Sequence, residues 1–247
     1  MANRKEKRSR ATKEFSRFAK AYDQYNIIQS EVAKTLIDKL ASKRYGTIID
    51  IGAGSGKVYK YLLEKDIAFE RFIALDSSSE MLDIHPEEES TEKICADFNE
   101  IETFKALPVS GEILLLSSSA LQWSKDPDLT FQALSKLSSQ AYFAIFTSNT
   151  FKTLHHYAGI DSPIYSENRL KEVIGRYYDA SYEVRHYKLY FDSVRDMFLY
   201  IKKSGVSGGE KKLGYKEIKT LMSVYPFDYL EFEVLFAEGT PKGARYV

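Results

Sequence analysis

The sequence predicts an α/β fold built on a mostly parallel sheet with helices on both faces. Three observations predict it: short apolar runs recur along the chain, helical patterns separate most of them, and polar residues close four of the runs (Asp50, Asp76, Asp97 and Ser117). Ligands of such sheets lie beyond the carboxyl ends of the strands. At 247 residues, with 44% hydrophobic and 14% aromatic residues, the chain is expected to form one domain over 1–247.

The predicted elements follow the chain in order. An N-terminal helical segment over 12–42 is indicated by the helical spacing of Val32, Leu36 and Leu40. Strands are expected at 47–51, 71–75, 92–95, 112–117, 141–147, 181–191 and 227–237, which gives a seven-stranded sheet. Helices are expected at 56–65, 78–83, 127–138, 150–158, 167–177, 193–203 and 215–224, and Asp126-Pro127 is suited to start the third of these. Residues 149–180 interrupt the alternation, and we interpret them as an α-helical lid insertion.

Composition and charge argue against several classes of protein. The formal net charge is zero, which disfavours a protein built to neutralise nucleic acid, and no apolar run approaches the ~20 residues of a membrane span. The single cysteine, Cys95, lies in an apolar run where we expect it to be buried, and the four histidines show no metal-ligand spacing. The first ten residues are basic without an apolar core, so we expect no secretory signal and a cytoplasmic protein.

A glycine-rich motif follows the first predicted strand. It reads Asp50-Ile51-Gly52-Ala53-Gly54-Ser55-Gly56, a G-x-G-x-G pattern. A dinucleotide fingerprint needs G-x-G-x-x-G, and here Lys57 occupies the place of its last glycine. A phosphate-binding P-loop is also a weak match, because Gly56-Lys57 supplies only the end of that motif. Asp50 lies close to where a pyrophosphate would sit and suits a cationic ligand better. A tight turn without any ligand is the alternative explanation of the glycines.

The motif resembles the first motif of the class I S-adenosylmethionine-dependent methyltransferases, which have a Rossmann-like fold. The resemblance implies that Asp76 takes the ribose hydroxyls, that Met81 and Phe98 pack on the adenine, and that Asp97 accepts from the adenine amino group. Asp97 is equally suited to cap a helix or form a turn. The implied cofactor-binding residues are Tyr22, Asp50, Gly52, Ala53, Gly54, Gly56, Asp76, Ser77, Met81, Asp97, Phe98 and Ser117.

Further segments narrow the resemblance to one family within the class I methyltransferases. They are Phe15-Ser16-Arg17, Ala21-Tyr22-Asp23 with Gln29, Ala120-Leu121-Gln122-Trp123, Thr150 to His155, Ile201 to Val206, and Tyr225-Pro226. Together they resemble the malonyl-acyl-carrier-protein O-methyltransferase family of biotin synthesis over nearly the whole chain after residue 14. Two positions depart from that family, which commonly has Asn at Ser118 and Gly at Asn149, and the departures leave room for a shifted substrate preference.

The resemblance implies methyl transfer from S-adenosylmethionine to the free carboxylate of malonyl-acyl-carrier protein, with S-adenosylhomocysteine as the second product. A malonyl carboxylate is already ionised at neutral pH, so no general base is expected and no catalytic residue is assigned. The implied substrate-binding residues are Tyr22, Gln122, Trp123, His155 and Lys202. Either His155 or Lys202 would pair with the carboxylate, whereas helix packing explains Tyr22 and a core position explains Trp123 equally well.

Charge and chemistry leave other interpretations open. Six lysines between residues 202 and 219 suggest either a solvated surface or a docking patch for an acidic carrier protein: Lys202, Lys203, Lys211, Lys212, Lys216 and Lys219. The alternative functions are another small-molecule methyltransferase, such as a quinone-precursor C-methyltransferase, and a non-catalytic nucleoside-binding module. The glycine spacing disfavours an NAD-linked oxidoreductase. The sequence does not distinguish malonyl-carrier protein from malonyl-coenzyme A, and it does not predict the oligomeric state.

Overall fold

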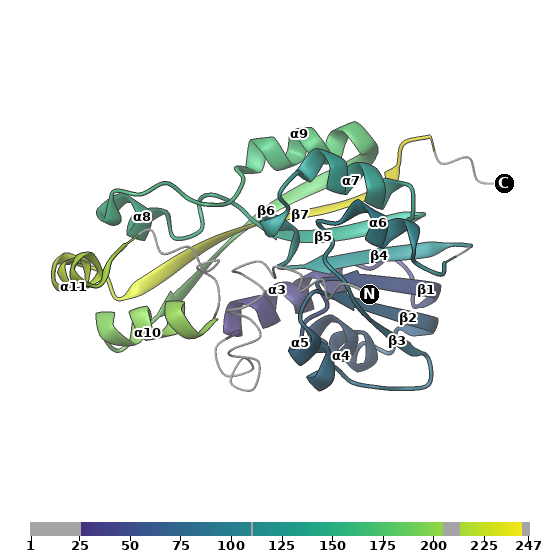
Figure 1. Cartoon of the computed structure of the whole chain (residues 1–247), viewed down its shortest axis with the longest axis horizontal. Coiled ribbons are helices and arrows are strands. Elements are labelled where there is room, and N and C mark those ends of the chain that lie inside the picture. The colour runs from purple at the N-terminus through teal and green to yellow at the C-terminus, as the bar shows by residue number, and fades with distance from the viewer. Residues whose placement is uncertain (1–25, 110, 205–212, 244–247) are drawn as a thin grey trace, which may run out of the picture.

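A seven-stranded sheet forms the centre of the computed structural model, which describes residues 26–109, 111–204 and 213–243 (Figure 1). In space the strands lie in the order β3-β2-β1-β4-β5-β7-β6. Their bounds are β1 (Arg44–Ile51), β2 (Ala68–Asp76), β3 (Thr91–Cys95), β4 (Ile113–Ser118), β5 (Gln140–Phe146), β6 (Tyr178–Tyr190) and β7 (Tyr229–Pro241).

Strand direction determines where a ligand can lie. Strands β1 to β5 are parallel to their neighbours among themselves, while β7 runs antiparallel to both β5 and β6. The strand order reverses between β1 and β4, because β2 and β3 lie on one side of β1 and the later strands lie on the other. In open α/β sheets the ligand crevice lies outside the carboxyl ends of the strands at such a reversal.

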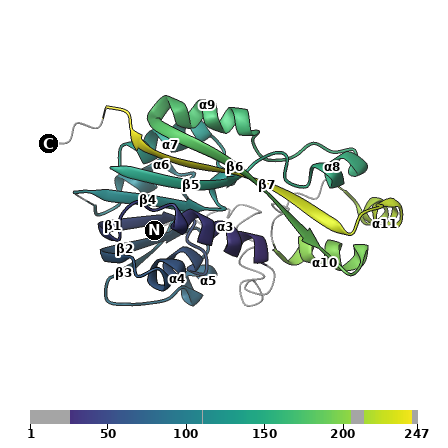
Figure 2. The ribbon, with the colours of Figure 1, turned by 180° about the vertical axis from the view of Figure 1, so that it is seen from behind.

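Helices cover both faces of the sheet (Figures 1 and 2). On one face lie α3 (Ile27–Asp38), α4 (Lys57–Glu64) and α5 (Ser79–Ile84), and on the other lie α6 (Ile101–Lys105), α7 (Pro127–Ser135) and α9 (Glu167–Tyr177). Successive strand residues alternate between the faces, so that Ile48 packs in the first apolar cluster and Ile49 in the second. Burial on both faces explains why the central strands read as continuous apolar runs.

An arm projects from one end of the sheet (Figures 1 and 2). It consists of α8 (Lys152–Ala158), α10 (Val194–Ser204), α11 (Tyr215–Val224) and the ends of β6 and β7 that pair at Tyr190 and Tyr229. Its buried side chains include Leu154, Met197 and Leu221, and they belong to the same apolar cluster as the α3 face of the sheet. The arm is therefore continuous with the main core.

Most predicted elements are found, with ends that differ by a few residues. All seven strands are present, but α6 and the 3-10 helix η2 (Leu121–Trp123) were not predicted. The predicted segment 12–42 is represented by α3, and its first part lies outside the described residues.

Residues 149–180 form α8 and α9. Because α9 buries Leu170 and Val173 in the core, the insertion helps to cover the sheet, and its action as a lid stays a prediction. The predicted burial of Cys95 is wrong, since it ends the edge strand β3 and is exposed.

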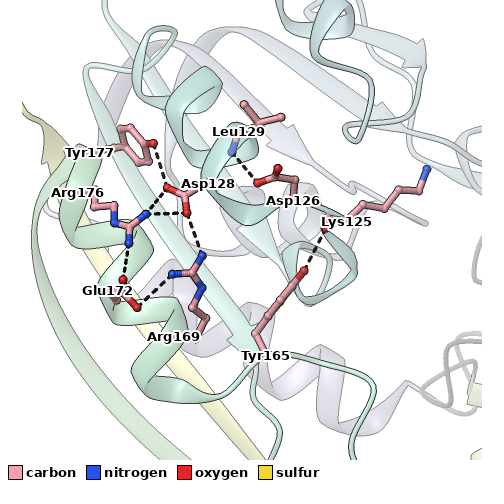
Figure 3. A network of polar contacts seen from close by, with 9 residues as sticks. All are labelled: Lys125, Asp126, Asp128, Leu129, Tyr165, Arg169, Glu172, Arg176 and Tyr177. Carbon is pink, nitrogen blue, oxygen red and sulfur yellow. Dashed lines mark hydrogen bonds and ion pairs between the residues drawn. The ribbon is translucent and has the colours of Figure 1, made fainter.

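A polar network joins the start of α7 to α9 (Figure 3). Asp126 caps α7 by accepting from Leu129 N at 3.1 Å, as the Asp-Pro pair predicts. Asp128 accepts from Arg169 Nη2 at 3.0 Å, Arg176 Nη1 at 2.8 Å and the Tyr177 hydroxyl at 3.1 Å. Burial acts against the charged form, yet the hydrogen bonds from Arg176 and Tyr177 hold the pKa of Asp128 below its usual value.

Replacing Asp128 with Ala is expected to lower the free energy of unfolding by about 1–2 kcal/mol, because several charge-assisted hydrogen bonds are lost at a partly exposed site. The lowered pKa means that this stabilisation is present above the unfolded carboxyl pKa of about 4 and is lost as the pH falls through the folded value. Urea titrations of wild type and variant at neutral and acid pH measure it. Glu167→Ala, which breaks an ion pair with Lys171 and removes a negative charge from the first turn of α9, is the control and should cost about 0.5–1 kcal/mol.

Candidate functional site

The glycine loop connects β1 to α4 and is tied to the neighbouring strand. The backbone N–H groups of Gly52 and Ala53 both donate to the Leu75 carbonyl, at 2.8 and 3.0 Å. Gly56 forms the N-cap position of α4 with a left-handed backbone. The loop therefore crosses the carboxyl ends of β1 and β2, where the sheet topology places a ligand.

Close packing explains why two of these residues are glycine. A Cβ on Gly52, whose φ is +75°, would lie 2.2 Å from the Ala120 Cβ. A Cβ on Gly56 would lie 2.5 Å from Pro86 Cδ and 2.9 Å from His85 Cδ2. The loop is thus held between the end of α5 and the segment after β4, with no room for a side chain at either position.

Asp76, at the end of β2, organises the neighbouring turns. Its Oδ2 accepts from Gly54 N at 2.9 Å, and its Oδ1 accepts from Ser78 N at 2.8 Å. Ser78 in turn caps α5 by accepting from Met81 N at 3.2 Å. Burial raises the pKa of Asp76, although hydrogen bonds from Ser78, Gly54 and Ser77 act in the opposite direction. The predicted residues Gly54, Asp76, Ser77 and Met81 are therefore brought together.

Asp50 is buried without a hydrogen-bond partner. It is 1% exposed, and neither carboxylate oxygen has a partner within the described protein. Burial raises the pKa of Asp50 to about 8, and the negative charge of Asp76 adds to this rise. An unpaired carboxyl in a dry position is costly unless a ligand supplies a donor or a positive charge. This orphaned group is the clearest sign of a ligand at the glycine loop.

The segment after β3 supplies Asp97 and Phe98. Asp97 Oδ1 accepts from both Asn99 N at 2.9 Å and Asn99 Nδ2 at 3.0 Å, so the turn role that the sequence left open is present. Its Oδ2 lies 3.9 Å from Lys125 Nζ. Phe98 packs in the second apolar cluster. Contact of Asp97 and Phe98 with an adenine ring stays a prediction.

Other predicted cofactor residues differ in their surroundings. Met81 is buried, and its Cε lies 3.5 Å from the place of a Cβ on Gly54, so it borders the loop. Ala53 is also buried. Ser117 is fully buried, and its hydroxyl donates to the Ile51 carbonyl at 2.8 Å, which binds β4 to β1. Tyr22 lies outside the described residues.

The post-β4 turn, which we define as residues 118–123 and which begins with the last residue of β4, contains two predicted substrate residues. Gln122 is buried and donates through Nε2 to the Ser119 carbonyl at 2.7 Å. Trp123 is half-buried and packs against the second apolar cluster. Contact of Ala120 with Gly52 places this turn directly against the glycine loop.

Two other predicted substrate residues belong to the arm. His155 lies on α8 with its ring 6.2 Å from the Phe151 ring. Lys202 lies on α10, but its side chain is outside the described part of the structure.

Sequence reasoning missed a buried carboxylate beside the turn after β5. Glu233, on β7, accepts from the Thr147 hydroxyl at 2.5 Å and from Asn149 Nδ2 at 2.9 Å, and it lies 2.9 Å from His186 Nε2. Burial acts against its charge, but the hydrogen bonds from Thr147 and Asn149 keep the pKa of Glu233 below its usual value. An acid at a core-facing position of an alternating strand was the available signal.

Metal-ligand clusters and membrane-spanning helices are both absent from the described residues. No group of three or more His, Cys, Asp or Glu side chains there is arranged to hold a metal ion. Among the helices of the described ranges, none has the length and apolar character needed to cross a membrane.

Comparison with known proteins finds several relatives. No family model matches the sequence. Malonyl-[acyl-carrier protein] O-methyltransferases are similar to it: that of Priestia megaterium is 28% identical over 58% of this chain, that of Acetivibrio thermocellus 33% over 57%, and that of Neorickettsia risticii 25% over 90%. The chain spans about half the length of the first two relatives, with 53% and 50% covered, and 92% of the third.

Solved structures show the fold. A chain of the complex between a methyltransferase and its activator from Haloferax volcanii aligns over 96% of this chain and all of its own (TM-score 0.59, 14% identity). Phosphoethanolamine N-methyltransferase 2 of Haemonchus contortus, in complex with S-adenosylhomocysteine, aligns over 92% of this chain and 58% of its own (TM-score 0.58, 14% identity). The protein has the Rossmann-like fold of class I methyltransferases, as the sequence predicted.

Proposed function

We propose that this protein is an S-adenosylmethionine-dependent carboxyl O-methyltransferase that esterifies the free carboxylate of malonyl-acyl-carrier protein, the step that primes pimeloyl-chain synthesis for biotin. The main observation in favour of this cofactor is that Asp50 is buried and unpaired beside the glycine loop and Asp76. The acceptor is supported by the names of the relatives and by the segments that resemble that family.

The residues at the end of β1 and β2 fit this cofactor chemically. Asp50 offers an unpaired carboxyl to the α-amino group, and the Asp76 oxygens retain lone pairs for two ribose hydroxyls. Met81 offers an apolar surface to the adenine face. When bound, S-adenosylmethionine supplies an electrophilic methyl group on a sulfonium centre. The protein residues bind and orient it there and exclude water.

No proton has to be moved to make the acceptor reactive. A carboxylate with an ordinary pKa is ionised at neutral pH and is already the nucleophile. The contribution of the protein is then to hold the carboxylate in line and to remove water, which can lower the barrier by roughly 7–11 kcal/mol. We therefore assign no general base, and we expect Gln122 and Trp123 to line the acceptor side.

A binding and transfer experiment tests the proposal. Malonyl-carrier protein and acetyl-carrier protein are incubated with the protein and S-adenosylmethionine, and mass spectrometry follows the acyl group. We expect one methyl group to be gained by malonyl-carrier protein alone. Calorimetry with S-adenosylmethionine, S-adenosylhomocysteine and NAD runs in parallel. Cofactor binding without methyl gain on the malonyl group would overturn the acceptor and leave another small-molecule methyltransferase or a non-catalytic module.

Exposed lysines on α11 are expected to attract the carrier protein, which is acidic. Lys216 and Lys219 flank the exposed Ile218, whereas Lys211 and Lys212 lie outside the described residues. We expect the double charge reversal Lys216→Glu and Lys219→Glu to raise KM for malonyl-carrier protein about fivefold at low salt, and less at high salt, because surface charge mainly speeds encounter. Reversal of Lys136, the exposed C-cap residue of α7, is the control. An unchanged KM at low salt would remove α11 from the docking surface.

A further inference from the structure

Three hydrogen-bond donors in the post-β4 turn are buried and unpaired within the described protein. They are the hydroxyls of Ser118 and Ser119 and the indole N–H of Trp123. The serines on either side have partners: Ser117 donates to the Ile51 carbonyl, and the Ser124 hydroxyl lies 2.8 Å from the Thr130 hydroxyl. Burying an unpaired donor costs free energy, so three of them in one turn call for an explanation.

The backbone of this turn is strained and firmly held. Ser119 has a φ of +61°, which is uncommon for a residue with a side chain. Its N–H donates to the Ala144 carbonyl at 2.8 Å, and its carbonyl accepts from Gln122 Nε2 at 2.7 Å. Backbone strain of this kind persists where the surrounding structure fixes it, and it is concentrated at ligand sites. The Ser119 hydroxyl is thus presented from a fixed position.

The place of the turn connects it to methyl transfer. Ala120 contacts Gly52, so the turn borders the loop that carries Asp50. The next basic residue along the chain, Lys125, is directed elsewhere: its N–H donates to Asn99 Oδ1 at 2.7 Å, and its ammonium group faces Asp97. The donors that the turn offers are therefore neutral.

We infer that the post-β4 turn binds the acceptor carboxylate through these neutral donors, the Ser118 and Ser119 hydroxyls and the Trp123 indole N–H. This inference rests on the proposed function and replaces the pairing with His155 or Lys202 that the sequence suggested. A carboxylate only accepts hydrogen bonds, so unpaired neutral donors are the type of group that its oxygens require. The acetyl group lacks that charge and gains less from the same donors.

The chemistry of the reaction explains why neutral donors suit this acceptor. One carboxylate oxygen uses a lone pair to form the bond to the methyl carbon while the carbon–sulfur bond breaks, and that bonding pair stays on sulfur. The carboxylate becomes a neutral ester, the sulfonium becomes a neutral thioether, and no proton moves. Because negative charge is lost on the way to the transition state, a lysine partner would stabilise the ground state more than the transition state and slow the step. Hydroxyl and indole donors orient the anion with a smaller penalty.

The test uses Ser118→Ala, which removes one donor with little change of shape, and Trp123→Phe, which removes the indole N–H together with part of the ring. We expect KM for malonyl-carrier protein to rise about tenfold in each variant, with kcat changed less than about twofold. Affinity for S-adenosylmethionine should stay at the wild-type value. Ser124→Ala is the matched control, because it removes a hydroxyl of the same region that is paired with Thr130. The control should lower the melting temperature and leave KM unchanged, whereas Ser118→Ala should melt at or above the wild-type temperature.

Binding measurements separate this inference from the proposed function. Calorimetry with malonyl- and acetyl-carrier protein is done in the presence of S-adenosylhomocysteine, so that no reaction is required. A wild-type preference for the malonyl form that Ser118→Ala and Trp123→Phe both reduce supports the inference, whether or not methyl transfer is seen. Equal binding of both carrier proteins by wild type, or a preference unchanged in both variants, would overturn it. Malonyl preference without methyl transfer would overturn the proposed function alone.

Discussion

Replacing Gly52 with Ala is expected to abolish cofactor binding and to destabilise the fold. The new Cβ would lie 2.2 Å from Ala120 Cβ, and the backbone has a φ of +75°. Steric overlap and the left-handed conformation together should lower the free energy of unfolding by about 2–4 kcal/mol. Displacing the loop also moves Gly54 away from Asp76, so affinity for S-adenosylmethionine should fall at least ~100-fold. Thermal melting and calorimetry measure the two effects.

A matched variant separates the overlap from the backbone strain. Gly111 has a φ of +81° with no atom within 4 Å of its would-be Cβ. Gly111→Ala therefore carries only the cost of the left-handed conformation, about 1–2 kcal/mol, and should bind the cofactor normally. Adding Ala120→Gly to Gly52→Ala removes the overlap and should restore part of the lost stability. If Gly52→Ala bound S-adenosylmethionine with wild-type affinity, the glycine loop would not be part of the cofactor-binding site.

Replacing Asp50 with Asn is expected to weaken cofactor binding at least ~100-fold and yet to stabilise the free protein. The variant loses the carboxylate that would face the α-amino group, while it keeps the shape of the side chain. In the free protein, burial raises the pKa of Asp50 to about 8, so the folded state resists an ionisation that the unfolded chain completes near pH 4. The amide avoids this penalty, and we expect a gain of about 1–2 kcal/mol after the cost of its own unpaired groups.

The raised pKa of Asp50 makes the stability of the protein depend on pH in a defined way. Between about pH 4 and pH 8 the folded wild-type protein binds more protons than the unfolded chain, so its stability falls as the pH rises through this window. The slope should be reduced in Asp50→Asn and retained in Asp83→Asn, which removes an exposed carboxylate of α5. A melting temperature that falls in Asp50→Asn, together with unchanged cofactor affinity, would contradict both the orphaned state of Asp50 and its ligand role.

Local signals were enough to predict the strands and the cofactor half of the site. Apolar runs locate β1 and β2, and the spacing from Asp50 through Gly56 to Asp76 identifies the turns that meet there. The five-residue α6 is too short to show a helical period, and an apolar run ending at Cys95 gives no sign that β3 lies at the sheet edge. The second error arises from sheet order, which depends on contacts between distant segments.

Two other features near the site depend on pairings that no local pattern shows. Glu233 meets Thr147 and Asn149 only because β7 lies against β5. The left-handed Ser119 and the unpaired donors around it follow from packing against Gly52 and β5, since serine itself does not favour that conformation. Sequence could name Gln122 and Trp123 as candidates, but the hydroxyls beside them became apparent only from their missing partners.

The reversed strand β7 also governs the order in which the glycine loop with the post-β4 turn, and then the turn after β5, can form during synthesis. Strands β1, β2, β4 and β5, with the glycine loop and the post-β4 turn, are complete once residue 146 has left the ribosome. The turn after β5, by contrast, is fastened to Glu233 near the other end of the chain. A nascent chain can therefore assemble the nucleoside side early, whereas the turn at residues 147–150 reaches its final arrangement only when the last strand joins the sheet.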